Sequence, residues 1–319
     1  MSTQDKTKST PYISVVVPFY NEEENAERLW NILHEVLSGM GKSWEVIFVD
    51  DGSTDDTRDI LRRLATANPE LKVILFRTNF GQSAAMAAGF KATRGEIVVA
   101  MDGDLQNDPR DIPVLLDRLN EGFDVVSGWR KNRKDTFLMR KLPSKIANRL
   151  ICSVTNVKLH DTGCSLKAFR GDMLRGISLY GELHRFIPAL LRMEGANINE
   201  IPVRHHPRKY GVSKYNLTRT FRVLMDLTTI RMLMKHLNDP LRFFAGFAWF
   251  CFWAGLFVLV TGMYQLFFNH VDVAQLNIPI TLIVLLWATA FQFLCYGLVG
   301  KLVVSTGSRK KFEYKEKVI

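Results

Sequence analysis

The sequence predicts an α/β fold with a mainly parallel sheet, followed by two helices that cross a membrane. Two observations predict the sheet: β-branched runs recur in the first part of the chain, and stretches with helical periodicity separate them. This alternation favours parallel strands with polar loops at their carboxyl ends. A third observation predicts the membrane helices, because residues 243–268 and 273–300 contain no charged side chain. Each stretch exceeds the roughly 20 residues that cross a bilayer as a helix.

Four strands are predicted in the first third of the chain, and each is followed by a polar loop. In order, the strand and loop pairs are Ile13–Pro18 with Phe19–Asn25, Trp44–Val49 with Asp50–Thr57, Val73–Phe76 with Asn79–Gln82, and Ile97–Met101 with Asp102–Gln106. Ligands of open parallel sheets bind outside the carboxyl ends of the strands. We therefore expect the loops at 18–22, 50–55 and 102–106 to meet at one edge and form a ligand crevice.

Asp102-Gly103-Asp104 is the candidate metal site at that edge. Side chains alternate along an extended chain, so both carboxylates point the same way, and Gly103 lets a ligand or another backbone come close. Mg²⁺ and Mn²⁺ prefer oxygen ligands, and one or two protein carboxylates suffice where substrate phosphates complete the coordination. Gln106 adds another oxygen. The alternative is a solvated turn, because Asp-Gly-Asp is also favourable turn chemistry.

Other chemistries lack support. No Gly-x-Gly-x-x-Gly fingerprint follows the first strand, and no complete phosphate-binding loop ending in Gly-Lys-Ser/Thr occurs, which argues against nicotinamide chemistry and ATP hydrolysis. Residues 1–10 are polar and lack the apolar segment of a signal peptide. The cysteines show no metal-ligand spacing and are expected to be buried thiols. They are Cys152, Cys164, Cys251 and Cys295.

The charge distribution predicts an integral membrane protein and its orientation. A net charge of +10 combined with 47% hydrophobic residues favours a membrane surface over a soluble nucleic-acid-binding protein; two buried core helices are the alternative to membrane spans. Nine Lys and Arg lie in Arg204–Arg242 and six in Lys301–Ile319, whereas Asn269–Asn277 holds none. The positive-inside rule therefore predicts that both ends of the hairpin, and with them the crevice, face the cytoplasm.

Basic segments connect the sheet to the spans. After a further strand and loop at 124–130, residues 130–149 interleave eight Lys and Arg with apolar residues, so 136–151 is predicted to lie on an anionic membrane face. A nucleic-acid-binding helix is the alternative. Residues 204–215 form a basic, glycine-hinged loop that either cradles phosphates or is solvated. Residues 216–240 alternate apolar and basic side chains and predict an interfacial helix.

Five motifs occur in an order that resembles glycosyltransferase family 2. They are Val17–Glu22, Val49–Asp55, Asn79–Gln82, Asp102–Gln106 and Gly211–Lys214. With the C-terminal hairpin, they look like the polyprenyl-phosphate branch of that family, which includes dolichyl- and undecaprenyl-phosphate glycosyltransferases. The resemblance covers nearly the whole chain and implies a Rossmann-like GT-A fold. The Gln-x-x-Arg-Trp motif of processive polysaccharide synthases is absent.

The resemblance implies an inverting transfer of one sugar from a UDP- or GDP-linked donor to undecaprenyl or dolichyl phosphate. Such an enzyme would use Mg²⁺ or Mn²⁺ at the cytoplasmic face of a bacterial inner membrane. Its product would serve cell-envelope glycan modification or protein glycosylation. Some relatives suggest a homo-oligomer, and no nucleic acid is expected as a partner. A metal with Arg and Lys would stabilise the leaving nucleoside diphosphate. A lipid monophosphate has a second pKa of about 6 and needs little help from a general base.

Site residues follow from the resemblance by position. Nucleotide-sugar binding is implied for Pro18, Tyr20, Glu22, Asp50, Asp51, Asp102 and Gly103, with Asp51 near the base, and metal binding for Asp102, Asp104 and Gln106. Arg130, Arg140 and Ser144 match positions near the donor and acceptor phosphates, and Arg208 and Lys214 match a mobile basic loop that closes over them. The implied catalytic set is Asp104, Arg130, Asp161, Arg208 and Lys214; the implied acceptor-phosphate set is Arg140, Ser144, Arg208 and Lys214.

The role of Asp161 stays open at this point. It could orient Arg140 or Lys167, act as a base, or cap its loop. Some relatives carry an acid immediately after Thr-Gly, where this chain has Cys164, so a catalytic base is not transferred by position. The structural roles are favoured.

The predicted organisation assigns each part of the chain a role. The parts are a polar tail at 1–10, a catalytic domain at 11–215, an interfacial helix at 216–240, a hairpin at 241–304 with spans near 243–266 and 278–302, and a basic cytoplasmic tail at 305–319. Two alternative functions remain. One is a membrane glycosyltransferase with another lipid acceptor, and the other is a non-catalytic membrane scaffold that retains the fold.

Overall fold

The computed structural model describes residues 10–131, 157, 159–174, 177, 179, 181, 183–207, 239–268 and 276–306. The chain divides into two compact units, Met1–Leu227 and Thr228–Ile319. The predicted interfacial segment at 136–151 lies outside the described residues. So does the predicted helix at 216–240, except for its last two residues, and the tail at 305–319, except for its first two.

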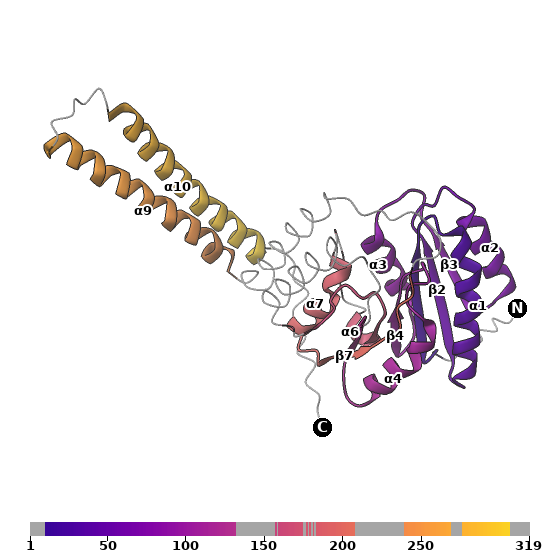
Figure 1. Ribbon diagram of the computed structural model, residues 1–319. Helices are drawn as coiled ribbons and strands as arrows, with labels where there is room; N and C mark the ends of the chain where they lie inside the picture. The colour runs from indigo at the N-terminus through magenta and orange to yellow at the C-terminus, as the bar shows by residue number, and fades with distance from the viewer. Residues whose placement is uncertain are drawn as a thin grey trace, which may run out of the picture. The chain divides into compact units, whose positions relative to one another are not determined.

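The described part of the first unit is a mixed sheet covered by helices on both faces (Figure 1). In chain order its elements are β1 (Ile13–Phe19), α1 (Glu23–Gly39), β2 (Trp44–Asp50), α2 (Thr57–Ala67), β3 (Leu71–Leu75), α3 (Gln82–Ala92), β4 (Ile97–Ala100), η1 (Pro109–Asp111), α4 (Ile112–Asn120), β5 (Val125–Trp129), β6 (Lys167–Arg170), α6 (Gly171–Leu174), η2 (Leu183–Phe186), α7 (Ile187–Met193) and β7 (Ile198–Pro202). The strand order is β3-β2-β1-β4-β6-β5-β7.

The sheet is mainly parallel, as the sequence predicted. Strand β1 pairs in parallel with β2 and β4, β2 with β3, and β5 with β7. Strand β6 runs antiparallel between β4 and β5, and neither β6 nor β7 was predicted. The reason for missing β6 is its length and composition: it has four residues and begins and ends with a basic side chain, so no apolar run marks it.

Two hydrophobic layers enclose the sheet, because alternate side chains of each strand enter opposite faces. Val15, Val17 and Phe19 of β1 pack with buried residues of α1, α2 and α4. Val16 packs on the other face with α3, α6 and α7. Figure 1 shows α1 and α2 on the opposite side of the sheet from α3. The helices thereby cover both faces of the sheet, and the parallel pairing of β1, β2, β3 and β4 puts their carboxyl ends at one edge.

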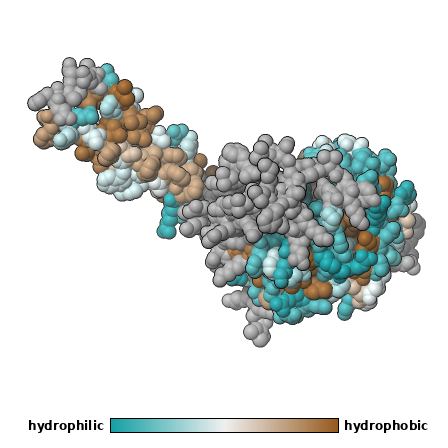
Figure 2. Space-filling view, in the orientation of Figure 1, coloured by the Kyte–Doolittle hydropathy of each residue, from teal (hydrophilic) through white to brown (hydrophobic). Residues whose placement is uncertain are grey.

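The described part of the second unit is a helical hairpin of α9 (Pro240–Phe268) and α10 (Asn277–Thr306). Both helices are long and apolar enough to cross a membrane, with a mean hydropathy of 2.1 in each. Only 11% of each apolar window is buried inside the described protein, whereas a core helix would be mostly buried, so membrane spans are favoured over two core helices. Figure 2 shows mostly hydrophobic surface on the hairpin in this view. The predicted spans at 243–266 and 278–302 lie within these helices.

Aromatic contacts hold the two hairpin helices together. The rings of Phe252 and Trp287 stack at 6.1 Å, and those of Phe247 and Phe293 at 5.5 Å. The Trp287 indole Nε1 also donates to the Phe252 carbonyl at 3.4 Å. The indole N–H therefore has a hydrogen-bond partner within the helix pair. An unpaired N–H would be costly in a bilayer, where no water can replace the partner.

Candidate active site

The carboxyl ends of the central strands meet at one edge of the sheet. Phe19 at the end of β1 lies opposite Asp50 at the end of β2, and Val16 opposite Ala100 at the end of β4. Because β6 is antiparallel, its first residue, Lys167, lies at this same edge, opposite Ala100 on one side and Ser127 on the other. The loops predicted to form a crevice therefore share one edge.

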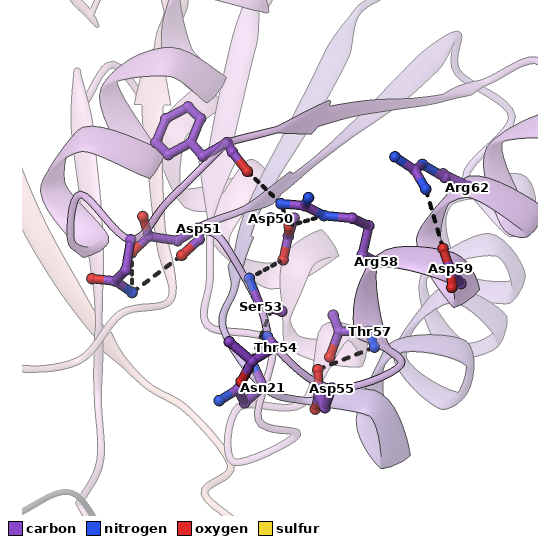
Figure 3. Close-up of polar contacts among 12 residues, drawn as sticks. Asn21, Asp50, Asp51, Ser53, Thr54, Asp55, Thr57, Arg58, Asp59 and Arg62 are labelled. Carbon is purple, nitrogen blue, oxygen red and sulfur yellow. Dashed lines mark hydrogen bonds and ion pairs between the residues drawn. The ribbon is translucent and has the colours of Figure 1, made fainter.

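The loops after β1 and β2 are tied to each other through side chains (Figure 3). Asn21 accepts from the Thr54 backbone N–H at 2.8 Å, and its own N–H donates to the Ser53 hydroxyl at 3.0 Å. The Glu22 N–H donates to Thr57 Oγ1 at 2.9 Å. Asn21 adopts φ 54°, a left-handed conformation that asparagine tolerates better than most residues. Tyr20 and Glu22, which were predicted to bind the nucleotide, therefore belong to a braced loop, whereas Pro18 lies in β1.

Asp50 is a structural residue of this edge. Its side chain is completely buried and pairs with Arg58 of α2, with Asp50 Oδ2 2.9 Å from Arg58 Nη2. Its other oxygen accepts from the Ser53 N–H at 3.1 Å, and Arg58 also donates to the Phe76 carbonyl. Both carboxylate oxygens face the protein interior. Direct contact between Asp50 and a nucleotide, which the sequence predicted, therefore plays no part in the function proposed below.

Replacing Arg58 with methionine is expected to destabilise the protein, because it leaves the Asp50 carboxylate buried without its cation. Breaking a buried pair costs about 3 kcal/mol, so we expect Tm to fall by about 5 °C or more. The measurement is thermal unfolding in detergent. Arg62→Met is the matched control, since Arg62 pairs with Asp59 at the surface and such pairs contribute little. An equal Tm for both variants would contradict the structural role of Asp50.

Asp51 anchors the loop that begins α3. Its carboxylate accepts from the Phe80 N–H at 2.8 Å, the Gly81 N–H at 3.0 Å and Asn79 Nδ2 at 3.1 Å. Gly52 permits this close approach: its φ is +73°, and a Cβ there would lie 2.4 Å from the Thr78 carbonyl carbon. The motifs Val49–Asp55 and Asn79–Gln82 are thus one structural unit. The proximity of Asp51 to a nucleoside base stays a prediction.

Asp102 and Asp104 lie beyond the end of β4 in a tight turn. Asp104 is 7% exposed and accepts from the Gln106 N–H at 3.1 Å. The Phe19 ring packs against Gly103, where an added Cβ would lie 2.7 Å from Phe19 Cε1, so a side chain of β1 is what comes close to this glycine. Leu105 adopts φ +58°, a conformation that costs a non-glycine residue about 1–2 kcal/mol. Such strain is typical of functional turns.

The charges around this pair fit a cation site. Burial and the Asp104 charge raise the pKa of Asp102 to about 6, against the opposing effects of Ser165, Lys167 and Arg130. Among the described residues no group of three or more His, Cys, Asp and Glu gathers as a metal cage. Two carboxylates with a neighbouring glutamine suit a hard divalent cation that takes its remaining ligands from a phosphate-bearing substrate.

Gln82, the first residue of α3, holds Asp102 in place. This role was not predicted from the sequence. Gln82 Nε2 donates to Asp102 Oδ1 at 2.6 Å. Next to it, the buried Ser83 hydroxyl lies 2.8 Å from His184 Nδ1, which joins η2 to α3. Burial, with the charges of Arg185 and Lys167, lowers the pKa of His184 to about 3, so this imidazole is neutral. The Asn79–Gln82 motif marked Gln82 as a candidate in the sequence, but nothing in the motif identified Asp102 as its partner.

Arg130 and Asp161 form an ion pair beside the carboxylates. Arg130 Nε lies 2.6 Å from Asp161 Oδ2 and Nη2 lies 3.0 Å from Oδ1, a bidentate arrangement in which both side chains are largely buried. Asp161 also accepts from the Gly163 N–H at 3.2 Å. The structural interpretation of Asp161 is thus supported, but its partner is Arg130. Lys167 Nζ donates to the Thr162 and Cys164 carbonyls, and an orienting role of Asp161 toward Lys167 stays a prediction.

The chain after β7 returns to the carboxylate turn. Arg204 pairs with Asp111 at 2.8 Å, the His206 N–H donates to the Gln106 carbonyl at 2.8 Å, and His206 Nε2 lies 3.3 Å from Asp108 Oδ2. The described chain therefore reaches the candidate metal site two residues before Arg208 in the sequence. Arg208 itself, with Lys214, Arg140 and Ser144, lies outside the described residues.

The mainly parallel sheet, with an Asp-x-Asp pair at its carboxyl edge, is of the GT-A class of glycosyltransferase fold. A family model described as glycosyl transferase family 2 matches residues 14–177. The chain belongs to glycosyltransferase family 2.

Two curated relatives and one solved structure extend this finding. The chain is 44% identical over 248 residues to dodecaprenyl-phosphate galacturonate synthase of Rhizobium johnstonii, covering 76% of this chain and 73% of that protein. It is 38% identical over 218 residues to undecaprenyl-phosphate 4-deoxy-4-formamido-L-arabinose transferase of Salmonella paratyphi B. This match covers 68% of this chain and 66% of that protein. Glucosyl-3-phosphoglycerate synthase from Mycobacterium tuberculosis, in complex with Mn²⁺, UDP and phosphoglyceric acid, matches with a TM-score of 0.53 and 22% identity over 70% of this chain and 78% of that one. The last likeness shows the fold.

Proposed function

We propose that this chain transfers one sugar from a UDP- or GDP-linked donor to a polyprenyl phosphate, with inversion at the anomeric carbon. The observation that carries the proposal is the pair of Asp102, which is half-buried, and Asp104, which is buried, beside an arginine that Asp161 fixes. Both curated relatives are named as transferases that act on a polyprenyl phosphate, dodecaprenyl in one and undecaprenyl in the other. Their identities of 44% and 38% support the same acceptor class here.

Asp102, Asp104 and Gln106 would hold a divalent cation, Mg²⁺ or Mn²⁺. When bound, such an ion supplies positive charge next to the oxygens of a leaving nucleoside diphosphate. The raised pKa of Asp102 supports this assignment, because loss of solvent and the neighbouring Asp104 charge both disfavour its ionised form, and a cation would offset that repulsion. The solved neighbour of the same fold contains Mn²⁺ together with UDP, which agrees with the donor class.

The side chains of the site account for the transfer without a strong general base. Two hydrogen bonds to Asp161 hold the Arg130 guanidinium in a fixed position. Its positive charge is therefore preorganised to stabilise the negative charge that develops on the donor diphosphate. A lipid phosphate monoester has a second pKa of about 6 and is already mostly ionised at neutral pH. Asp161, engaged by Arg130, therefore positions a cation in this proposal and does not abstract a proton.

The remaining predicted contacts complete the proposal. Tyr20 and Glu22 of the braced loop, with Pro18 near the end of β1, bind the nucleoside, and Asp51 shapes the neighbouring loop. Arg140, Ser144, Arg208 and Lys214 contact the acceptor and donor phosphates. The Gln106 carbonyl accepts from the His206 N–H, which links the carboxylate turn to the basic segment 204–215 that contains Arg208 and Lys214.

The two apolar helices support a location in a membrane, and the charges that flank them support one orientation. Lys and Arg are absent from Asn269–Asn277 and abundant on both outer flanks of the hairpin. We propose that both termini and the catalytic unit face the cytoplasm, in the inner membrane of a bacterium. Assembly as a homo-oligomer stays a prediction.

The test is a panel of radiolabelled UDP- and GDP-sugars with undecaprenyl phosphate, Mn²⁺ or Mg²⁺, and purified protein. Transfer moves label into the organic phase, and the active donor identifies the sugar and the base. A parallel panel with diacylglycerol and with a lipid-linked oligosaccharide separates the acceptor classes. Failure of every donor with undecaprenyl phosphate would refute the proposed acceptor, and donor consumption with diacylglycerol alone would replace it.

A further inference from the structure

Lys167 is a buried cation at the edge of the site, and the proposed reaction assigns it no role. It is the first residue of β6, and only 4% of it is exposed. Residues opposed across an antiparallel pair point to the same face, so Lys167 enters the face of Ala100, which packs with α3. Gln82 of α3, which binds Asp102, lies on this face as well.

The ammonium of Lys167 has an unusual set of partners. Nζ donates to the Cys164 carbonyl and to the Thr162 carbonyl at 3.4 Å. Among the described residues, no carboxylate forms an ion pair with it. Burial lowers the pKa of Lys167, while nearby negative groups, Asp161 and Asp102 among them, favour its charged form. An ammonium buried against neutral carbonyls is costly, and such groups gather at functional sites.

The two carbonyls belong to the loop that carries Asp161. Thr162 follows Asp161 directly, and Asp161 holds Arg130 through two hydrogen bonds. Next in the chain, the Ser165 hydroxyl accepts from the Asp102 N–H at 3.3 Å and from Asn107 Nδ2 at 2.7 Å. The two hydrogen bonds from Lys167 to the Thr162 and Cys164 carbonyls therefore act on the loop that connects the Arg130–Asp161 pair to the backbone of the carboxylate turn.

We propose that Lys167 is a positioning residue for sugar transfer. By holding the Thr162 and Cys164 carbonyls, it sets the distance between Arg130 and the Asp102–Asp104 pair. This inference rests on the proposed function. Lys167 touches no reacting atom; it acts through Asp161 and Arg130. A displacement of about 1 Å at a catalytic group can cost roughly 10²-fold in rate, so a tether of this kind has a measurable effect.

The test compares Lys167→Met with Lys167→Arg, using the donor that the panel identifies and undecaprenyl phosphate. Methionine keeps the length of the side chain and removes both hydrogen bonds, and we expect kcat to fall about 20-fold with little change in the acceptor KM. Arginine keeps the positive charge and the hydrogen-bond donors, so kcat should fall less in Lys167→Arg than in Lys167→Met. Lys91→Met, at an exposed position of α3, is the matched control and should retain wild-type kcat.

Two further readouts separate positioning from a general loss of structure. In an Arg130→Lys background, Lys167→Met should lower kcat by less than about threefold, because residues that act through one another are not additive. Mn²⁺ binding, measured by titration, should be unchanged or tighter in Lys167→Met, since the ammonium and the metal carry the same sign of charge. Weaker Mn²⁺ binding with an additive loss in the double variant would overturn the inference.

The remaining outcomes are also decisive. If Lys167→Met does not fold, Lys167→Gln replaces it, and failure of both neutral variants to fold would show a folding role and overturn the inference. Wild-type kcat in a folded neutral variant would overturn it as well. An inactive wild-type protein would instead refute the proposed function, so the two failures are distinguishable.

Discussion

Replacing Asp104 with asparagine is expected to lower kcat/KM for sugar transfer by at least about 10³-fold, the scale of losing a main electrostatic contribution to a transition state. Asparagine has nearly the same shape, and its carbonyl oxygen can still accept from the Gln106 N–H, so the turn persists. The loss comes from charge, because one carboxylate in place of two weakens the site for a divalent cation. The measurement is initial rate against Mn²⁺ concentration with the active donor.

Metal-dependent stability provides the control for this variant. Mn²⁺ at about 100 times its dissociation constant should stabilise the wild-type protein by about 2.7 kcal/mol, which raises Tm by several degrees, and EDTA should reverse the shift. Asp104→Asn should show little of this shift while its metal-free Tm stays near or above that of the wild type, since it removes the repulsion from Asp102. Asp59→Asn, on an exposed side chain, should behave as wild type in both assays. Full transfer activity in Asp104→Asn would refute the metal assignment.

The amino-acid sequence is sufficient to predict the framework of the site, for a physical reason. Parallel strands bury both faces, so β1, β2 and β4 are visible as apolar runs, and the residues that follow them must lie at one edge. The positions of Asp51, Asp102 and Asp104 at that edge follow from this pattern. The hairpin is equally predictable, because a membrane span needs only length and the absence of charge.

The partners of those residues could not be predicted, because they depend on packing between distant segments. Asp50 and Asp51 are adjacent and chemically identical, yet Asp50 is fixed by Arg58 of α2 while Asp51 binds the loop before α3. Their opposite orientation follows from strand alternation, but which helix supplies a partner does not. The pairing of Asp161 with Arg130 likewise requires β6, which left no apolar signal in the sequence.

Replacing Arg130 with lysine is expected to lower kcat about 10²-fold, although the charge is kept. The guanidinium makes two parallel hydrogen bonds to Asp161 and still presents further donors, whereas an ammonium is a point charge on a flexible stem and cannot do both. Misplacement of the cation relative to the donor diphosphate therefore costs rate. Arg63→Lys, whose side chain is 67% exposed, is the matched control and should retain full activity.

Asp161→Asn distinguishes positioning from base catalysis at the same site. If Asp161 only fixes Arg130, Asp161→Asn should lower kcat by an amount similar to Arg130→Lys, and the kcat–pH profile should keep its shape in both variants. The double variant should then be little worse than either single one, because both changes disturb one cation. If Asp161 were a general base, its replacement would abolish the acidic limb of the profile, whereas Arg130→Lys would leave that limb in place. The bidentate geometry of the pair favours the first result, since a carboxylate held by two guanidinium bonds is poorly placed to accept a proton from the acceptor.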